Sequence, residues 1–220
     1  MAISDSFNQG DHDAAVHEAI AAVDANPDEP APYATLATLL TSLGDYDQAT
    51  ELLVKSLGRF PDDEELQYSF GVLAFAQGDA QTAIARLTPL ANAISQLGTD
   101  AQYMLGLSYQ ALGQAPKALA FALTAHDRQP DKVDAALLSA NLLLSLGAFA
   151  EAEAMLAPFV AQKNAQVLFN YGLALNAQDK DGAAYLDQAE AIDPHTYNQQ
   201  FDQLKDISRF LNWRGENDHG

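Results

Sequence analysis

Apolar residues recur at three-and-four spacing along most of the chain, and no stretch shows the apolar–polar alternation of a half-buried strand. Residues 42–53, SLGDYDQATELL, show the local arrangement. Here Gly-Asp-Tyr separates two apolar-rich stretches, each with the spacing of an amphipathic helix. The pattern predicts an all-helical protein in which short glycine-containing turns join consecutive helices.

The glycine of this turn recurs at a nearly constant interval. Successive glycines are 34, 34, 35 and 34 residues apart, at Gly10, Gly44, Gly78, Gly113 and Gly147. An alanine stands five residues after each glycine, at positions 15, 49, 83, 118 and 152. A glycine and an alanine that recur together at the same interval, here called the glycine and alanine columns, indicate an internal repeat. Each repeat is predicted to be a pair of antiparallel helices, A and B.

The second repeat resembles the tetratricopeptide repeat. Its aromatic, small and apolar positions are occupied by Tyr33, Leu36, Ala37, Leu40, Gly44, Asp45, Tyr46, Ala49, Leu53, Ser56 and Pro61. The resemblance covers residues 1–194, in units of about 1–29 (partial), 30–63, 64–98, 99–132, 133–164 and 165–194. It implies a bacterial-type protein of about six repeats, stacked as a right-handed α-solenoid. The sixth unit lacks two residues at the turn between its helices.

The repeated spacing within the chain has a physical basis in the helix ends. A glycine after helix A supplies a left-handed backbone conformation, and Asp45 or Asp79 can then cap helix B. A proline ends helix B, and the aspartate that follows is predicted to cap the next helix A, at Asp28, Asp62 and Asp131. Small residues at positions 71, 106 and 172 permit close helix packing.

Two prolines depart from this pattern. Pro89 and Pro158 fall inside helix B of the third and fifth units, where proline should kink or shorten a helix. They are 69 residues apart, as are Pro61 and Pro130. The units are therefore predicted to alternate in kind, which suggests the hypothesis that a module of two units was duplicated.

Residues 195–220 form the last segment. Tyr197, Phe201, Leu204, Ile207, Phe210 and Leu211 share one face at helical spacing, so an amphipathic helix is predicted. Two roles are open for it: a cap that covers the last repeat, or a helix that binds a partner.

In a solenoid of this kind the A helices line the concave surface. The positions expected to face that surface are Ala34, Thr38, Thr41, Tyr68, Val72, Phe75, Tyr103, Leu107, Gln110, Leu137, Asn141, Leu144, Phe169, Leu173 and Asn176. Their apolar and aromatic character predicts a groove for a peptide or helix of another protein, with the two asparagines bonding its backbone. The alternative is that these residues are internal packing, or are covered by the tail or by a second copy.

Charge narrows the expected ligand. The chain has 30 acidic and 11 basic residues, a formal charge of -19, which disfavours nucleic acid and anionic membrane surfaces. Some members of the resembled family bind acidic chain termini through a clamp of Lys, Arg and Asn on the A helices. No lysine or arginine occupies the expected groove positions here, whereas Glu65, Asp100 and Asp134 border them. The ligand is therefore predicted to be apolar and neutral or basic.

Catalysis is not indicated. The five histidines form no i, i+4 pair, no nucleotide-binding glycine loop occurs, and there is no cysteine. Carboxylate runs such as PDDEE at 61–65 fit helix starts rather than metal sites, so neither a metal nor a cofactor is expected. No secretory signal or membrane span is recognisable, so a cytoplasmic location is the expectation.

Two functions remain open from the sequence. The first is an adaptor, assembly factor or chaperone-like module that binds another protein and is not an enzyme. The second is a self-associating structural protein whose exposed terminal helices form a homodimer.

Overall fold

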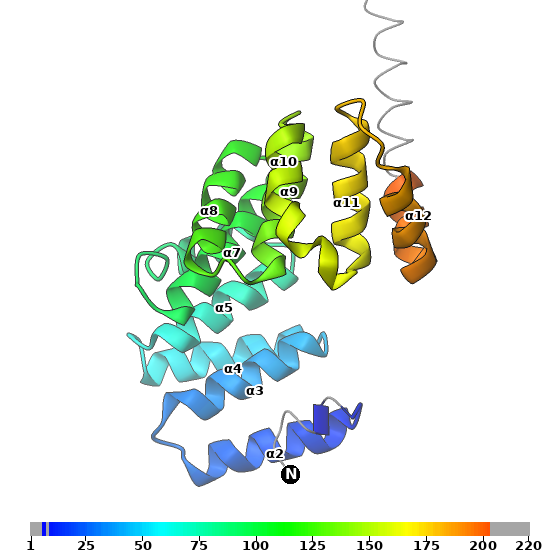
Figure 1. The fold of residues 1–220 in the computed structure, drawn as a ribbon. Helices are drawn as coiled ribbons and strands as arrows, with labels where there is room; N and C mark the ends of the chain where they lie inside the picture. The colour runs from blue at the N-terminus through cyan, green and yellow to red at the C-terminus, as the bar shows by residue number, and fades with distance from the viewer. Residues whose placement is uncertain (1–5, 8, 203–220) are drawn as a thin grey trace, which may run out of the picture. The chain divides into compact units, whose positions relative to one another are not determined.

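The structure is a computed structural model that describes residues 6–7 and 9–202. Within these residues every regular element is a helix, which confirms the predicted fold class, an all-α solenoid of antiparallel helix pairs (Figure 1). The A helices are α3 (Pro30–Ser42), α5 (Glu64–Ala76), α7 (Gln96–Ala111), α9 (Val133–Ser145) and α11 (Ala165–Asn176). The B helices are α2 (His12–Ala25), α4 (Tyr46–Arg59), α6 (Ala80–Leu87), α8 (Ala115–Arg128), α10 (Phe149–Leu156) and α12 (Ala183–Ile192).

The chain divides into two compact units, Met1–Gln129 and Pro130–Gly220, here called the N-terminal and C-terminal units. In the N-terminal unit α3 packs on α2, α4 and α5, and α7 packs on α5, α6 and α8. In the C-terminal unit α11 packs on α9, α10 and α12. Each A helix therefore contacts its own B helix and, in the same unit, the A helix of the next repeat.

The turns between A and B helices have the predicted geometry. The turn glycines have positive φ values of 69–82°, at Gly10, Gly44, Gly78, Gly113 and Gly147. In the second repeat the amide of Gly44 donates to the Thr41 carbonyl (3.1 Å), and the amide of Asp45 donates to the Leu40 carbonyl (2.9 Å). This pair of bonds is a Schellman motif, which satisfies carbonyls that the helix end leaves free.

The sixth turn keeps the same motif without a glycine. Asp179, seven residues after Gly172, has φ 57°, and its amide donates to the Asn176 carbonyl at 3.1 Å. The amide of Lys180 donates to the Leu175 carbonyl at 3.0 Å. The two residues that the sixth repeat lacks would therefore follow the turn, between Asp179 and Gly182. Helix α12 begins at Ala183, directly after the close approach of Gly182 to Gly172.

The caps of the A helices differ from the prediction. Asp28, Asp62 and Asp131 do not cap α3, α5 and α9, whose N-cap residues are Glu29, Asp63 and Lys132. The Pro-Asp pair occupies the middle of a turn, in which the amide of Asp63 donates to the Phe60 carbonyl, so each helix begins one residue later than expected. The capping aspartate of α5 is Asp63, which accepts from the Leu66 amide at 2.9 Å.

The caps of the B helices follow the prediction in part. Asp79 caps α6 by accepting from the Thr82 amide at 3.0 Å. Hydrogen bonds from the Thr82 side chain first, and then from its amide, lower the pKa of the Asp79 carboxyl. Asp45 is the N-cap residue of α4 but makes no capping bond. Its carboxylate accepts instead from the side chain of Gln48 at 2.6 Å.

The B helices alternate in length, as the prolines predict. Helices α4 and α8 have 14 residues each, whereas α6 and α10 have 8. Helix α6 ends at Leu87, two residues before Pro89, and an irregular segment 88–95 follows. Helix α10 ends at Leu156, and a 3-10 helix, Ala157–Gln162, contains Pro158. The duplication of a two-unit module stays a hypothesis.

The small-residue columns lie where helices A and B meet. Ala49, Ala83, Ala118 and Ala152 are fully buried. A β-carbon on Gly71 would lie 2.6 Å from Cγ of Leu87, so the helix pair of the third repeat approaches too closely for a larger residue. The packing thus confirms the role predicted for these positions.

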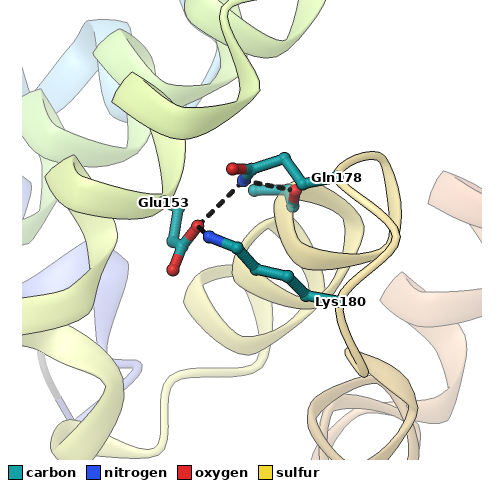
Figure 2. A network of polar contacts seen from close by, with 4 residues as sticks. Glu153, Gln178 and Lys180 are labelled. Atoms are coloured by element: carbon teal, nitrogen blue, oxygen red, sulfur yellow. Dashed lines mark hydrogen bonds and ion pairs between the residues drawn. The ribbon is translucent and has the colours of Figure 1, made fainter.

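A polar network joins the last two repeats of the C-terminal unit. Figure 2 shows Glu153 of α10 accepting from Lys180 (2.6 Å) and from Gln178 (2.8 Å), which lie in the turn after α11. These bonds, the one from Lys180 first, lower the pKa of the Glu153 carboxyl. The network therefore holds the glycine-free turn against the neighbouring repeat.

The start of the predicted tail helix is present. Residues 194–202 are helical, and Tyr197 and Phe201 pack against the cluster of Leu168, Phe169 and Ala189. The rest of the predicted helix, including Leu204, Ile207, Phe210 and Leu211, lies outside the described residues. Its two proposed roles, cap or partner-binding helix, stay predictions, although the described part covers apolar residues of the last repeat.

Candidate peptide-binding groove

An open groove of about 750 Å³ crosses the A helices of the N-terminal unit. Three consecutive A helices, α3, α5 and α7, supply nearly all of its lining. The lining residues are Phe7, Ala34, Thr35, Thr38, Leu39, Ser42, Glu65, Tyr68, Ser69, Gln96, Leu97 and Asp100. The groove thus lies on the face that the repeat pattern assigns to ligand binding.

Helix α3 provides the apolar part of the groove. Ala34 and Leu39 are each 6% exposed and belong to the core cluster, against which Phe7 also packs. The hydroxyls of Thr35 and Ser42, in contrast, donate to carbonyls of their own helix, Ala31 (3.1 Å) and Thr38 (2.9 Å). Because these hydroxyl protons are already used, the α3 side offers mainly methyl and aliphatic surface to a ligand.

The other side of the groove is polar and acidic. Glu65 lies in the first turn of α5, and Asp100 lies 35 residues later in the first turns of α7, so the two carboxylates occupy the same position of consecutive repeats. The side-chain amide of Gln96 donates to Oδ1 of Asp100 at 2.7 Å, and Gln96 itself accepts from Gln129. This chain of bonds orients Asp100 along one edge of the groove.

Tyr68 of α5 also lines the groove. Burial raises the pKa of its phenol to about 12, and the negative charge of Asp100 adds to the effect. The phenol therefore stays neutral at physiological pH and can donate a hydrogen bond. Its ring at the same time packs against the core cluster around Leu105.

Several other residues predicted for this part of the groove do not line it. Val72, Phe75, Tyr103 and Leu107 are half-buried and pack against the same core cluster as Tyr68. Gln110 is exposed at the end of α7. Ala34, Thr38 and Tyr68 are the predicted positions that line this groove, and a ligand contact by any predicted residue stays a prediction.

In the C-terminal unit several predicted groove residues have structural partners. Leu137 is 7% exposed, and Phe169 is 3% exposed with its ring edge-on to Tyr197, at a centroid distance of 5.4 Å. The amide oxygen of Asn141 accepts from Asn170 at 2.6 Å, and that of Asn176 accepts from the Gly182 amide at 2.8 Å. Leu144 and Leu173 are half-buried.

Sequence reasoning did not select most of the lining. The missed residues are Phe7, Thr35, Leu39, Ser42, Ser69, Gln96 and Leu97, while Glu65 and Asp100 were expected at the border. A signal for two of them exists, since Thr35 and Ser69 are small polar residues one repeat of 34 residues apart, each beside a selected position. Gln96 and Leu97 were missed because α7 begins at residue 96, before the expected start of its unit at 99.

The described residues give no sign of a metal site or a membrane-spanning helix. They contain no group of three or more histidines, aspartates and glutamates placed to hold a metal ion. None of their helices is both long and apolar enough to cross a bilayer. The lysines and arginines of the described part lie on B helices, turns or loops, as predicted, and none lines the groove.

Comparisons with known proteins agree with the repeat pattern. Two sequence profiles, each of the tetratricopeptide repeat, match residues 7–69 and residues 103–157. No curated protein sequence matches the chain significantly. The two profile matches fall in repeats that the periodicity of glycine and alanine had delimited.

Solved structures with the same fold are found at low sequence identity. The protein pilF of Pseudomonas aeruginosa is 17% identical, with a TM-score of 0.77 over 91% of this chain and 93% of its own. PilW, a widely conserved type IV pilus biogenesis factor, is 18% identical, with a TM-score of 0.74 over 88% and 91%. YrrB, a tetratricopeptide protein with an unusual peptide-binding site, is 21% identical, with a TM-score of 0.63 over 84% and 97%.

Stacked helix pairs with a groove across their A helices define a helical-repeat scaffold, a class that acts by binding other proteins. The chain belongs to the tetratricopeptide repeat family. Proteins of this family are generally interaction scaffolds and not enzymes, which agrees with the coarse function expected from the sequence.

Proposed function

We propose that this protein is an adaptor, assembly factor or chaperone-like module that binds a segment of another protein in the groove of the N-terminal unit. The observation that carries this proposal is the groove itself, an open volume of about 750 Å³ whose α3 side is apolar. A segment that buries an apolar side chain there gains roughly 25 cal/mol for each Å² removed from water.

The ligand is apolar and neutral or basic. Glu65 and Asp100 lie in the groove wall, and no lysine or arginine of the described residues faces them there. An acidic chain terminus would therefore meet like charge and would lose water without gaining a partner. A cytoplasmic location and the absence of catalysis stay predictions.

The proposal is tested by blocking the groove without disturbing the core. Thr38 is exposed and lines the groove, so Thr38→Trp should fill it while the protein stays folded. Gln81→Trp, at an exposed position of α6, adds the same ring elsewhere and is the matched control. Peptides that bind the full chain should lose binding to Thr38→Trp and retain it for Gln81→Trp.

Equal binding by wild type and Thr38→Trp, with circular dichroism unchanged, would overturn the proposal. The homodimer remains the competing prediction. Sedimentation velocity distinguishes the two, because a self-associating structural protein would form a stable dimer whose formation Thr38→Trp leaves intact.

A further inference from the structure

The acidic end of the groove carries polar groups that make few or no hydrogen bonds with the rest of the described protein. Ser69 is 5% exposed and lines the groove, yet its hydroxyl has no hydrogen-bond partner in the described residues. Two other buried hydroxyls, in contrast, donate within their own helices: Thr41 to the Ala37 carbonyl at 2.8 Å and Ser108 to the Met104 carbonyl at 2.7 Å. Because Ser69 lies in the groove wall, a bound ligand can supply the hydrogen bond that the described residues do not.

The carboxylates beside Ser69 are also incompletely used. Glu65, one turn before Ser69 on α5, has no hydrogen bond or ion pair with the rest of the described chain. Asp100 uses Oδ1 to accept from Gln96, which leaves its second oxygen for another donor. Two negative charges that share a groove wall favour an occupant that carries positive charge.

From these groups we infer that the groove recognises a cationic side chain, lysine or arginine, in the segment that it binds. The cation lies between Glu65 and Asp100, and Ser69 and the Tyr68 phenol complete the polar contacts around it. An adjacent apolar residue of the same segment packs on Ala34, Leu39 and Leu97. This inference rests on the proposed function, because it names the chemistry of the ligand in the same groove.

The geometry of the acidic wall favours this occupant over a free metal ion. Among the described residues, two carboxylates line the groove and no group of three or more acidic or histidine residues is placed to hold a metal ion. A protonated amine or guanidinium supplies several N–H donors, which match two carboxylates, a hydroxyl and an aromatic ring. The Gln129–Gln96–Asp100 chain of hydrogen bonds holds one carboxylate in position before the ligand arrives.

The test is a selection of peptides from a random dodecapeptide display library on the immobilised full-length chain. Selections run in parallel on wild type, on Glu65→Gln/Asp100→Asn, and on the matched control Glu64→Gln/Asp127→Asn. Glu64 shares the first turn of α5 with Glu65, and both control residues are exposed and do not line the groove. Wild type and control should yield sequences enriched in one lysine or arginine beside an apolar residue.

Affinities of the selected peptides then give the magnitude. Neutralising both carboxylates should weaken binding about tenfold or more, since hydrogen bonds to charged groups are the stronger ones. Replacing the peptide's cation by glutamine should weaken binding to wild type by a similar factor and should have little effect on binding to Glu65→Gln/Asp100→Asn. Ser69→Ala should lower the affinity for the cationic peptide more than the affinity for the peptide that carries glutamine in place of the cation.

Each other outcome has a distinct meaning. Peptides that lose binding to Thr38→Trp but show no cation preference would overturn the cation site and leave the proposed function standing. Selected peptides that bind Thr38→Trp as tightly as wild type would overturn both the cation site and the proposed function. Residues 203–220 contain Lys205, Arg209 and Arg214; if deleting them raises affinity for the selected peptides at least tenfold, the occupant is the chain's own segment and the partner cation is refuted.

Discussion

Gly182 stands at the closest backbone approach of the sixth repeat. A β-carbon there would lie 2.2 Å from the Gly172 carbonyl oxygen and 2.7 Å from Oδ1 of Asn176, which caps this amide. Gly182→Ala should therefore push α12 away from α11 and lower the free energy of unfolding by about 1–3 kcal/mol, the usual cost of overpacking. Urea denaturation of the full chain measures the change.

A second glycine gives the matched control. Gly58 lies in α4, and a β-carbon on it would meet no atom within 4 Å. Gly58→Ala should therefore raise stability by about 0.5–1 kcal/mol, because alanine loses less backbone entropy in a helix. If both variants changed stability alike, the close contact at Gly182 would have no energetic role.

Tyr68 gives a prediction about pH. Its phenol pKa is raised to about 12, by burial first and then by the charge of Asp100. The unfolded chain releases this proton near its ordinary value of 10.0, so the folded state loses stability as pH rises from about 10 to 12 and keeps the full contribution below that range. Nuclear magnetic resonance of labelled tyrosine ring carbons follows the titration.

Asp100→Asn should move the Tyr68 pKa down toward 10, because the variant removes a nearby negative charge. Asp127→Asn, at an exposed site on α8, should leave it in place. A Tyr68 resonance that titrates near 10 in the wild type would show that the phenol is not buried beside Asp100.

At the scale of elements, the segment 88–95 decides where α7 begins, and hence where Gln96, Leu97 and Asp100 lie. Arg128 of α8 donates to the Ala91 and Ala93 carbonyls, both at 3.1 Å, and Gln102 also donates to Ala91 at 2.8 Å. Arg128→Ala should lower the free energy of unfolding by about 1–3 kcal/mol, because the Ala91 and Ala93 carbonyls lose a partly buried charged donor. Amide exchange in residues 88–95 should become faster.

Arg59→Ala is the control for this prediction. Arg59 also pairs with an acceptor in another repeat, Asp28, but both side chains are largely exposed. Its removal should change stability by about 0–1 kcal/mol and leave exchange in residues 88–95 unaltered. Slow exchange in this segment of Arg128→Ala would mean that Pro89 and local turns hold it without the arginine.

The network of Glu153, Gln178 and Lys180 makes the sixth turn sensitive to acid (Figure 2). The Glu153 pKa is lowered from 4.5, so its contribution to stability is complete above that pH and is lost as pH falls through the lowered value. Glu153→Gln should be less stable than wild type near neutral pH, and the difference should shrink in acid. Amide exchange in α11 and α12 reports it.

Glu151→Gln alters an exposed carboxylate on the same helix and should show no such convergence. A difference between wild type and Glu153→Gln that stays constant with pH would mean that the charge on Glu153 does not stabilise the turn.

The turns and helix pairs of the repeats could largely be predicted from the sequence. The glycine and alanine columns located five turns and the helix pairs, because a positive φ and a close helix contact each admit few residue types. The sixth turn was missed at Asp179, because aspartate tolerates the left-handed conformation without appearing in a glycine column. Counting seven residues from Gly172, as from Gly71 to Gly78, would have found it.

The groove was harder to predict than the turns. The groove positions were chosen by a fixed spacing within each unit, but helix starts vary: α5 begins one residue after Asp63, and α7 begins after an irregular segment with its own cap at Ser95. These shifts change which residues of a helix face the groove. Ser69 and Gln96 therefore line it, whereas Phe75 packs against the core cluster. The acidic border at Glu65 and Asp100 was predicted, because the two carboxylates recur at the same position of consecutive repeats, near the start of each A helix.

At the scale of the whole molecule, the formal charge of -19 acts on folding and on binding in opposite ways. Like charges repel across a compact acidic chain, so raising salt from about 20 to about 500 mM should screen the repulsion and raise the midpoint of thermal unfolding. The same screening weakens the attraction between Glu65, Asp100 and a cationic peptide, so the peptide's dissociation constant should rise. Differential scanning fluorimetry and fluorescence polarisation on the same samples measure both.

The peptide in which glutamine replaces the cation separates the effect of salt on stability from its effect on the attraction in the groove. Its binding should depend little on salt, because an apolar contact with Ala34, Leu39 and Leu97 carries no charge, while the thermal midpoint rises as before. If both peptides weakened equally with salt, the attraction would come from the general field of the protein, and the carboxylates of the groove would have no local role. If neither weakened, the positive charge would lie outside the groove, and the cation site would be refuted at physiological ionic strength.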